Sequence, residues 1–158
     1  MKKIIFTFAL LCVFSCFVKA QGNSIGNRVL AQIQADGTIT LKVTEAQLNT
    51  YLTELLNNVV KIKGTITKSQ IILLSDKKSW VLRGKGTEGS GSVQSRLISV
   101  QLVIEGSQNL KVAAGGTTET CTGNPCSACD FLITGGCGCG DAAEGHTCNH
   151  TITKTNPN

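Results

Sequence analysis

The sequence predicts an α+β fold, in which one helix packs across an antiparallel sheet of five to seven strands and a small disulfide-rich tail follows. Two patterns of apolar residues and one cluster of cysteines predict this fold. Apolar residues recur every three or four positions over residues 45–59, and at every second position in much of residues 61–113. Six cysteines then crowd into residues 121–148, beyond the last alternating segment.

The first 20 residues have the pattern of an export signal. Lys2 and Lys3 precede an apolar run over residues 4–18, and Val18-Lys19-Ala20 supplies small residues for cleavage before Gln21. No later apolar stretch approaches the roughly 20 residues that a membrane-spanning helix needs. We therefore expect an exported protein, secreted or held in the periplasm or at the cell surface, without a transmembrane segment.

A lipid anchor at Cys16 is the alternative, but Phe14 fits a lipoprotein cleavage box poorly. The expected organisation has three parts. A signal peptide covers residues 1–20, a helix-on-sheet domain covers residues 21–115, and a cysteine-rich tail module covers residues 116–158.

Charge is divided unevenly between these parts. The chain has 15 basic and 10 acidic side chains, and three bases lie in the signal, so cleavage leaves a net charge of +2. Residues 21–115 carry 11 bases and 6 acids, whereas residues 116–158 carry one base and 4 acids. Because the bases are scattered and aromatic residues are few, a nucleic-acid partner is not expected.

A hairpin is predicted at the start of the domain. Residues 28–35 and 38–43 alternate on either side of Asp36-Gly37, a two-residue turn in which glycine accepts positive φ.

The helix that follows has the clearest start signal in the chain. Thr44 can cap it, and Gln47 three residues later completes a capping box. Its apolar stripe predicts a face that packs on the sheet. The stripe consists of Leu48, Leu52, Leu55, Leu56 and Val59.

Alternation at every second residue predicts the strands of the sheet. The candidate strands are residues 61–67, 70–74, 79–83, 92–105 and 110–113. The glycine-rich residues 84–91 are predicted to form a hairpin tip, because a strand follows them where a phosphate-binding loop requires a helix. Trp80 and Tyr51 are expected at the edge of the core. The whole arrangement is similar in topology to a cystatin-like roll, although no residue motif of that family is present.

The six tail cysteines predict three disulfides, since their number is even and the compartment is oxidising. Cys137 and Cys139 are too close to bond each other without strain, so each should have a different partner. The sequence does not choose among the 15 possible pairings. Phe131, Leu132 and Ile133 are the only core that the tail offers. The candidate disulfide residues are Cys121, Cys126, Cys129, Cys137, Cys139 and Cys148.

Two alternative chemistries use the same cysteines. A zinc site could draw on pairs of thiolates together with a histidine, His146 or His150. Its candidate ligands are Cys126, Cys129, Cys137, Cys139, Cys148 and His150. A thiol-disulfide redox centre would use Cys126-Ser-Ala-Cys129, although no βαβ pattern surrounds it.

The spacing of Cys121, Cys126 and Cys129 also resembles the first three ligands of a plant-type two-iron ferredoxin. The resemblance covers about ten residues and lacks one clear fourth ligand.

No catalytic constellation is visible, and both histidines lie in the tail. An enzyme is therefore not expected. The sequence favours a non-enzymatic binding protein, secreted or associated with the surface, that needs no cofactor and has an extracellular protein or glycan as its partner. The alternatives are a zinc-binding protein and a thiol-disulfide redox protein.

Overall fold

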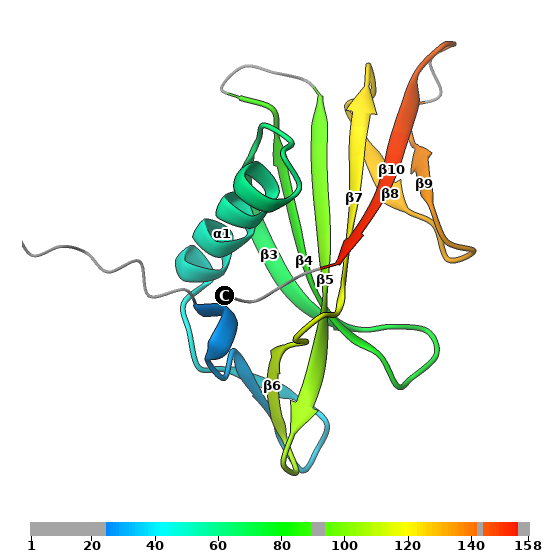
Figure 1. The fold of residues 1–158 in the computed structure, drawn as a ribbon. Coiled ribbons are helices and arrows are strands. Elements are labelled where there is room, and N and C mark those ends of the chain that lie inside the picture. Colours follow the sequence, from blue (N-terminus) through cyan, green and yellow to red (C-terminus); the bar gives the residue numbers. More distant parts are fainter. Residues whose placement is uncertain (1–24, 90–93, 142–143, 155–158) are drawn as a thin grey trace, which may run out of the picture.

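A computed structural model describes residues 25–89, 94–141 and 144–154. The predicted export signal and the alternative anchor at Cys16 lie outside these residues. Helix α1 (Glu45–Glu54) continues as a turn of π-helix, η2 (Leu55–Val59), and crosses one face of an eight-stranded antiparallel sheet (Figure 1). The predicted α+β class is therefore confirmed. Within the described residues, no helix is both long and apolar enough to cross a membrane.

The domain before residue 116 supplies six strands of this sheet, within the five to seven predicted. They are β1 (Ala31–Ile33), β2 (Ile39–Leu41), β3 (Thr65–Leu73), β4 (Trp80–Thr87), β5 (Ser95–Glu105) and β6 (Asn109–Val112). A short 3-10 helix, η1 (Ile25–Asn27), precedes them. The cysteine-rich segment adds β7 (Thr117–Asn124) and β10 (Thr147–Lys154) to the same sheet, and forms a separate pair from β8 (Cys129–Phe131) and β9 (Cys137–Cys139).

Strand β5 is the centre of the sheet. One of its edges pairs with β4 along the whole length of β4, and β3 lies beyond β4. Its other edge is shared, because residues 96–100 pair with β7 and residues 102–105 pair with β6. The sheet therefore divides beside β5 into a β7-β10 branch and a β6-β1-β2 branch, which diverge in Figure 1.

The first hairpin has a three-residue loop, so the predicted two-residue turn was wrong. Ile33 pairs with Ile39, and Gln34 and Thr38 close the loop through an N–H to carbonyl bond of 2.8 Å. Gly37 is the last loop residue and has a φ of +82°. A tight turn followed by a left-handed glycine is the common geometry of three-residue hairpins.

Helix α1 begins as predicted. The backbone N–H of Gln47 donates to Thr44 Oγ1 at 3.2 Å, and the backbone N–H of Thr44 donates to Gln47 Oε1 at 2.9 Å. The predicted stripe is buried except at Val59, the last residue of η2, which is 42% exposed. The core on this side joins the helix to the sheet. Its fully buried large side chains are Leu30, Leu48, Leu52, Leu56, Leu82, Ile98, Val100 and Leu110.

The outer edge of β3 is satisfied by polar side chains of α1. The backbone N–H of Ile66 donates to Thr53 Oγ1 at 2.9 Å, and Asn49 Nδ2 donates to the carbonyl of Thr67 at 2.9 Å. These bonds use groups that would otherwise be open to pairing with another strand. The helix therefore covers the sheet and also protects part of its edge.

Two strand predictions need correction. Residues 61–67 and 70–74 were predicted as separate strands, but β3 runs unbroken through Lys68 and Ser69, with a bulge between Ile66 and Lys68. The predicted glycine-rich tip began too early, because residues 84–87 belong to β4. Residues 90–93, which include the start of the predicted strand 92–105, lie outside the described part of the chain.

Tyr51, the only tyrosine, is buried as predicted, and Trp80 packs partly buried against the same core. Burial raises the pKa of Tyr51 to about 12. The unfolded chain has a tyrosine pKa of about 10, so the folded protein holds the phenol proton more tightly. We expect the stability that depends on the neutral phenol to be full below pH of about 10 and to be lost as the pH rises through the folded value.

Ultraviolet absorbance of the phenolate during an alkaline titration measures this directly, since no other tyrosine contributes. The Tyr51→Phe variant serves as the control. Its free energy of unfolding should stay within about 1 kcal/mol of the parent's, because the buried hydroxyl has no hydrogen-bond partner among the described residues. Ionisation of the folded parent at the ordinary pKa would contradict the expectation.

Candidate functional site

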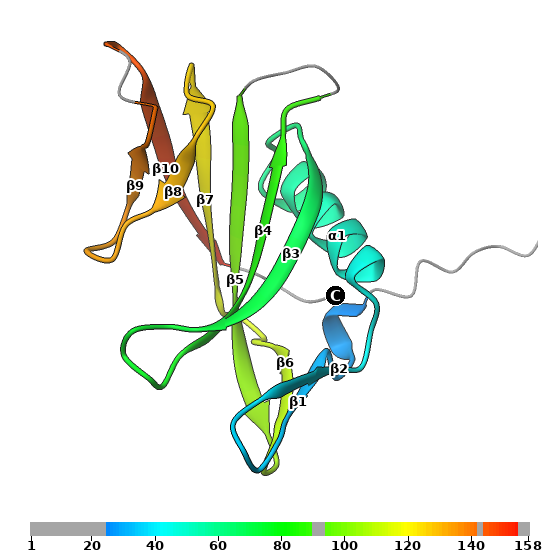
Figure 2. The same ribbon diagram turned by 180° about the vertical axis from the view of Figure 1, so that it is seen from behind.

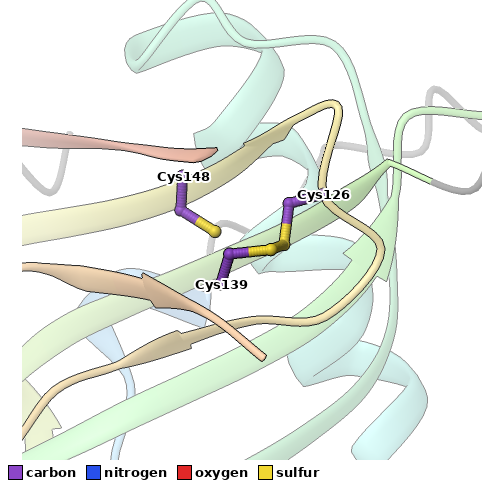
Figure 3. Close-up of side chains that lie close together, drawn as sticks. All are labelled: Cys126, Cys139 and Cys148. Atoms are coloured by element: carbon purple, nitrogen blue, oxygen red, sulfur yellow. A yellow bond between two sulfur atoms is a disulfide. The ribbon is translucent and has the colours of Figure 1, made fainter. Parts of the chain in front are cut away.

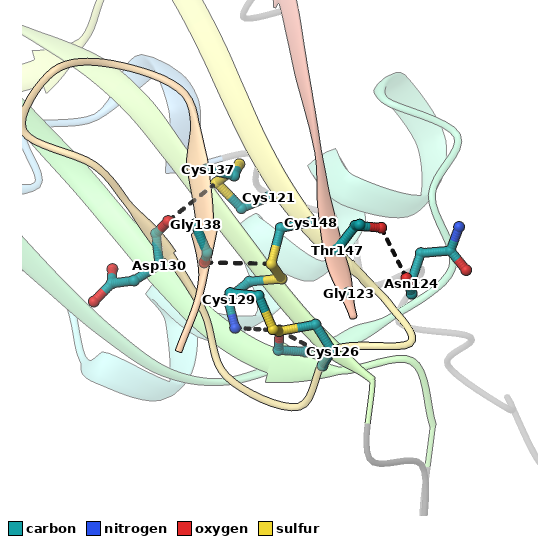
Figure 4. The surroundings of a disulfide bond; sticks show 12 residues. Cys121, Gly123, Asn124, Cys126, Cys129, Asp130, Cys137, Gly138, Thr147 and Cys148 are labelled. Atoms are coloured by element: carbon teal, nitrogen blue, oxygen red, sulfur yellow. Dashed lines mark hydrogen bonds between the residues drawn. A yellow bond between two sulfur atoms is a disulfide. The ribbon is translucent and has the colours of Figure 1, made fainter. Parts of the chain in front are cut away.

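The six tail cysteines form three disulfides, as the sequence predicted. Cys121 is bonded to Cys137, Cys126 to Cys139, and Cys129 to Cys148. Cys137 and Cys139 therefore have different partners, as expected from their spacing. The bridges tie β7, β8, β9 and β10 together, and Figure 4 shows how closely they are grouped. Three disulfides indicate that the protein folds in an oxidising, extracellular type of environment.

The bridges form a second core on the face of the sheet opposite α1, called here the helix-free face. Side chains alternate across strands, and the register places Leu97 beside Cys121 on this face. These two residues are buried together with Cys126 and Cys129, and Phe131 packs against them. Figure 2 views this face, with β8 beside β7 and β9 beside β10. The tail thus covers one end of the sheet, and cystines take the place of a larger apolar core.

The structure brings some of the candidate zinc ligands together. The sulfur atoms of Cys126, Cys139 and Cys148 lie within 4.8 Å of one another (Figure 3). Each is bonded to another sulfur, however, and zinc binds the thiolate form of cysteine. His150 lies apart from them, with Nε2 3.1 Å from Glu119 Oε2. A second group of possible ligands among the described residues consists of Cys139, Asp141 and His146. Cys129 and Cys137 belong to neither group.

The two cysteines of the candidate redox pair have different disulfide partners. Cys126 and Cys129 would have to form a disulfide with each other, and each is bonded to a different cysteine. The CxxC spacing is here a consequence of the crowded tail.

Asp141 forms the centre of a polar cluster beside the bridges. Its Oδ2 accepts the Ser127 N–H at 3.1 Å and lies 3.0 Å from His146 Nδ1, while Oδ1 lies 2.7 Å from the sulfur of Cys139. The hydrogen bond with His146, followed by the one from Ser127, lowers the pKa of Asp141. The Ser127 hydroxyl also bonds to this carboxylate, at 3.2 Å. In a catalytic triad the histidine lies between the serine and the carboxylate. Here the carboxylate of Asp141 lies between Ser127 and His146, so the serine hydroxyl has no histidine beside it to act as a base.

Beside the bridges, an open apolar groove runs along the helix-free face. It has a volume of about 320 Å³ and lies between the sheet and the turn over residues 131–136. The sheet provides Ile72, Leu73, Val81, Arg83, Ser99 and Glu119, and the turn provides Phe131, Leu132 and Ile133. We call this site the apolar groove.

The 131–136 turn presents its apolar side chains to solvent. The N–H of Gly135 donates to the carbonyl of Leu132 at 3.1 Å, so Ile133 lies at the apex and is 93% exposed. Gly135 and Gly136 have φ of +89° and +81°, which other residues rarely adopt. Leu132 is 48% exposed. The prediction that Leu132 and Ile133 form the tail's core was therefore wrong, and of the three residues only Phe131 packs inward.

A second depression adjoins the first. It has a volume of about 280 Å³, and we call it the basic groove. Its lining consists of Lys68, Gln70, Arg83, Gly84, Lys85, Leu97 and Asp130. Arg83 lines both grooves, and its guanidinium carbon lies 4.9 Å from the centre of the Phe131 ring.

Sequence reasoning missed both grooves. Their walls come from β3, β4, β5, β7 and residues 130–136, which are separate segments of the chain, and no motif connects them. The one available signal was the apolar triplet Phe131-Leu132-Ile133, which was predicted to be the core of the tail. Comparisons of the chain with protein-family models, with curated proteins and with solved structures found no significant match.

Proposed function

We propose that this chain is an exported, non-enzymatic binding protein that holds an extended polypeptide segment of a partner protein in the apolar groove. One observation carries the proposal. Ile133 is 93% exposed on a turn whose flanking strands are fixed by disulfides, and it borders a groove floored by Ile72 and Val81. Exposed apolar side chains around a concave surface are typical of binding sites.

Rigidity supports this choice. Bridges hold the strands on both sides of the turn, Cys129 before it and Cys137 after it. A wall fixed in this way loses little conformational freedom when a ligand binds. The disulfide tail is therefore proposed to position the turn over the sheet, as well as to stabilise the fold.

The lining also favours a polypeptide over a glycan. Both Trp80 and Tyr51, the large side chains most suited to stacking, pack against the core on the helix side. Side chains on the helix-free floor are instead aliphatic, at Ile72 and Val81. An extended peptide places alternate side chains on one face, which suits an apolar groove of this kind.

Panning a displayed library of random peptides on the immobilised protein tests the proposal. We expect apolar peptides to be enriched, and we expect Ile133→Asp to weaken their binding about tenfold or more, because burying one large apolar side chain contributes about 1.5–3 kcal/mol. The substitution should leave thermal unfolding unchanged, since the side chain is almost fully exposed.

Val103→Asp is the matched control. Val103 is 43% exposed on β5, pairs with Lys111 of β6 and lines neither groove. The Val103→Asp variant should bind the enriched peptides as the parent does. Failure to enrich any peptide, or equal binding by the parent and Ile133→Asp, would refute the proposed function.

A further inference from the structure

Two arginines on this sheet differ sharply in their partners. Arg96 is buried, and its guanidinium donates to the carbonyls of Lys63 at 3.1 Å and Ser95 at 3.0 Å. It also pairs with Glu88 at 3.2 Å. Such a satisfied arginine is a structural residue.

The side chain of Arg83 has no hydrogen bond or ion pair with any described residue. The Arg83 Nε atom is buried but lacks a hydrogen-bond partner among the described residues. The guanidinium makes a cation–π contact with the Phe131 ring. A buried donor without a partner is costly, and stacking on an aromatic ring holds a guanidinium in a fixed orientation. The side chain is thus held in position while its donors are unused by the protein.

The surroundings of Arg83 carry excess positive charge. Lys68 and Lys85 line the basic groove with it, against a single carboxylate, Asp130, whose Oδ1 accepts the neighbouring Phe131 N–H at 2.8 Å. The acid of the apolar groove, Glu119, lies beside His150 at 3.1 Å. Neither carboxylate forms an ion pair with Arg83 in the described structure.

We propose that Arg83 anchors a carboxylate of the bound peptide, with Lys68 and Lys85 beside it, so that the partner segment combines an apolar and an acidic side chain. This inference rests on the proposed function and names the ligand class of the same site. Guanidinium groups bind carboxylates through two parallel hydrogen bonds, and the planar fork favours this geometry over a point charge. Arg83 lines both grooves, so an apolar residue in the first and an acidic residue nearby in the second can belong to one extended strand.

Fluorescence anisotropy of the enriched peptides provides the test. Each acidic residue of a peptide is replaced by its amide, and binding is measured to the parent and to Arg83→Gln. With the parent, one replacement should weaken binding about tenfold. With Arg83→Gln, the acidic peptide should already bind about tenfold more weakly, and the same replacement should have no further effect.

Three further variants sharpen the test. Arg83→Lys should recover only part of the affinity, because it keeps the charge and loses the fork. Arg28→Gln, at an exposed arginine that lines neither groove, is the matched control and should bind as the parent does. Lys85→Gln, at an exposed position of the basic groove, should reduce the salt dependence of binding, and tests the proposal independently if Arg83→Gln is unstable.

The outcomes separate the two proposals. If peptides bind but replacement of their acidic residues has no effect, or if Arg83→Gln binds like the parent, the anchoring role is overturned and the proposed function stands. If no peptide binds at all, both are overturned. Heparin, a sulfated glycan, is added as a competitor, and displacement of the peptides that depends on Arg83 would assign the anion to a glycan and overturn the peptide assignment.

Discussion

Removal of the Cys129–Cys148 bridge, as the double variant Cys129→Ala/Cys148→Ala, is expected to lower the free energy of unfolding by about 3 kcal/mol. This bridge has the largest sequence separation of the three, 19 residues, and it ties β8 to the edge strand β10. Opening it releases the unfolded chain from a closed loop, and it also weakens a core that consists largely of cystines. Urea unfolding followed by circular dichroism measures the change.

Both cysteines must be replaced together. The sulfur of Cys148 lies within 4.8 Å of the sulfurs of Cys126 and Cys139, so a single free thiol would be placed to attack the neighbouring bridge and change the pairing (Figure 3).

Reduction supplies the control for this variant. When the parent and the double variant are both fully reduced, their stabilities should differ by less than about 1 kcal/mol, because the bridge is then absent from both. A double variant that is as stable as the oxidised parent would contradict the prediction, and would show that the two remaining bridges and the pairing of β7 with β10 hold the tail without this bridge.

The helix-side half of the fold could be predicted because its signals are local. The Thr44 and Gln47 capping box lies within four residues, and the stripe from Leu48 to Leu56 is read directly from its spacing. Local signals were less reliable where an irregularity in a strand decides whether the strand continues. Lys68 and Ser69 look like a break between two strands, yet a bulge lets β3 continue through them.

For the tail, the sequence predicted the disulfides but not the strands. Strands β7 and β10 are rich in threonine and lack apolar alternation, so neither was predicted as a strand. β7 is recruited through its pairing with residues 96–100, about 20 residues earlier in the chain, and a non-local pairing of this kind leaves no periodic signal. The disulfide partners depend on the same pairing, which is why sequence spacing alone left 15 possibilities.

The candidate site follows from this assembly. Arg83 and Phe131 are 48 positions apart in sequence, and they meet because β7 carries the disulfide-bonded segment onto the helix-free face. Neither residue had a distinguishing pattern in its own neighbourhood. The sequence could therefore indicate a tail held together by disulfides, whereas the position and charge of the grooves required the structure.

Close approach of β3 to β4 predicts a second large effect, at Gly86. The bulge between Ile66 and Lys68 presses the backbone of β3 towards this glycine, and a Cβ atom there would lie 1.8 Å from the carbonyl oxygen of Thr65. The obstacle is backbone, which cannot move away without breaking the pairing of β3 with β4. Gly86→Ala is therefore expected to lower the free energy of unfolding by about 3 kcal/mol or more, at the upper end of overpacking effects.

Substitutions at two other glycines serve as comparisons, and the stability of all three variants is measured by urea unfolding. At Gly84 the nearest atom to an added Cβ is the flexible end of Leu52, 2.6 Å away, so Gly84→Ala should cost a smaller amount, about 1–2 kcal/mol. At Gly89 no atom of the described residues lies within 4 Å of an added Cβ, and Gly89→Ala should change stability by less than about 0.5 kcal/mol. Equal effects at all three positions would mean that general strand propensity, rather than contact with the backbone of Thr65, decides the cost. The expected order, Gly86 above Gly84 above Gly89, would instead establish that the bulge in β3 requires a glycine in the facing strand.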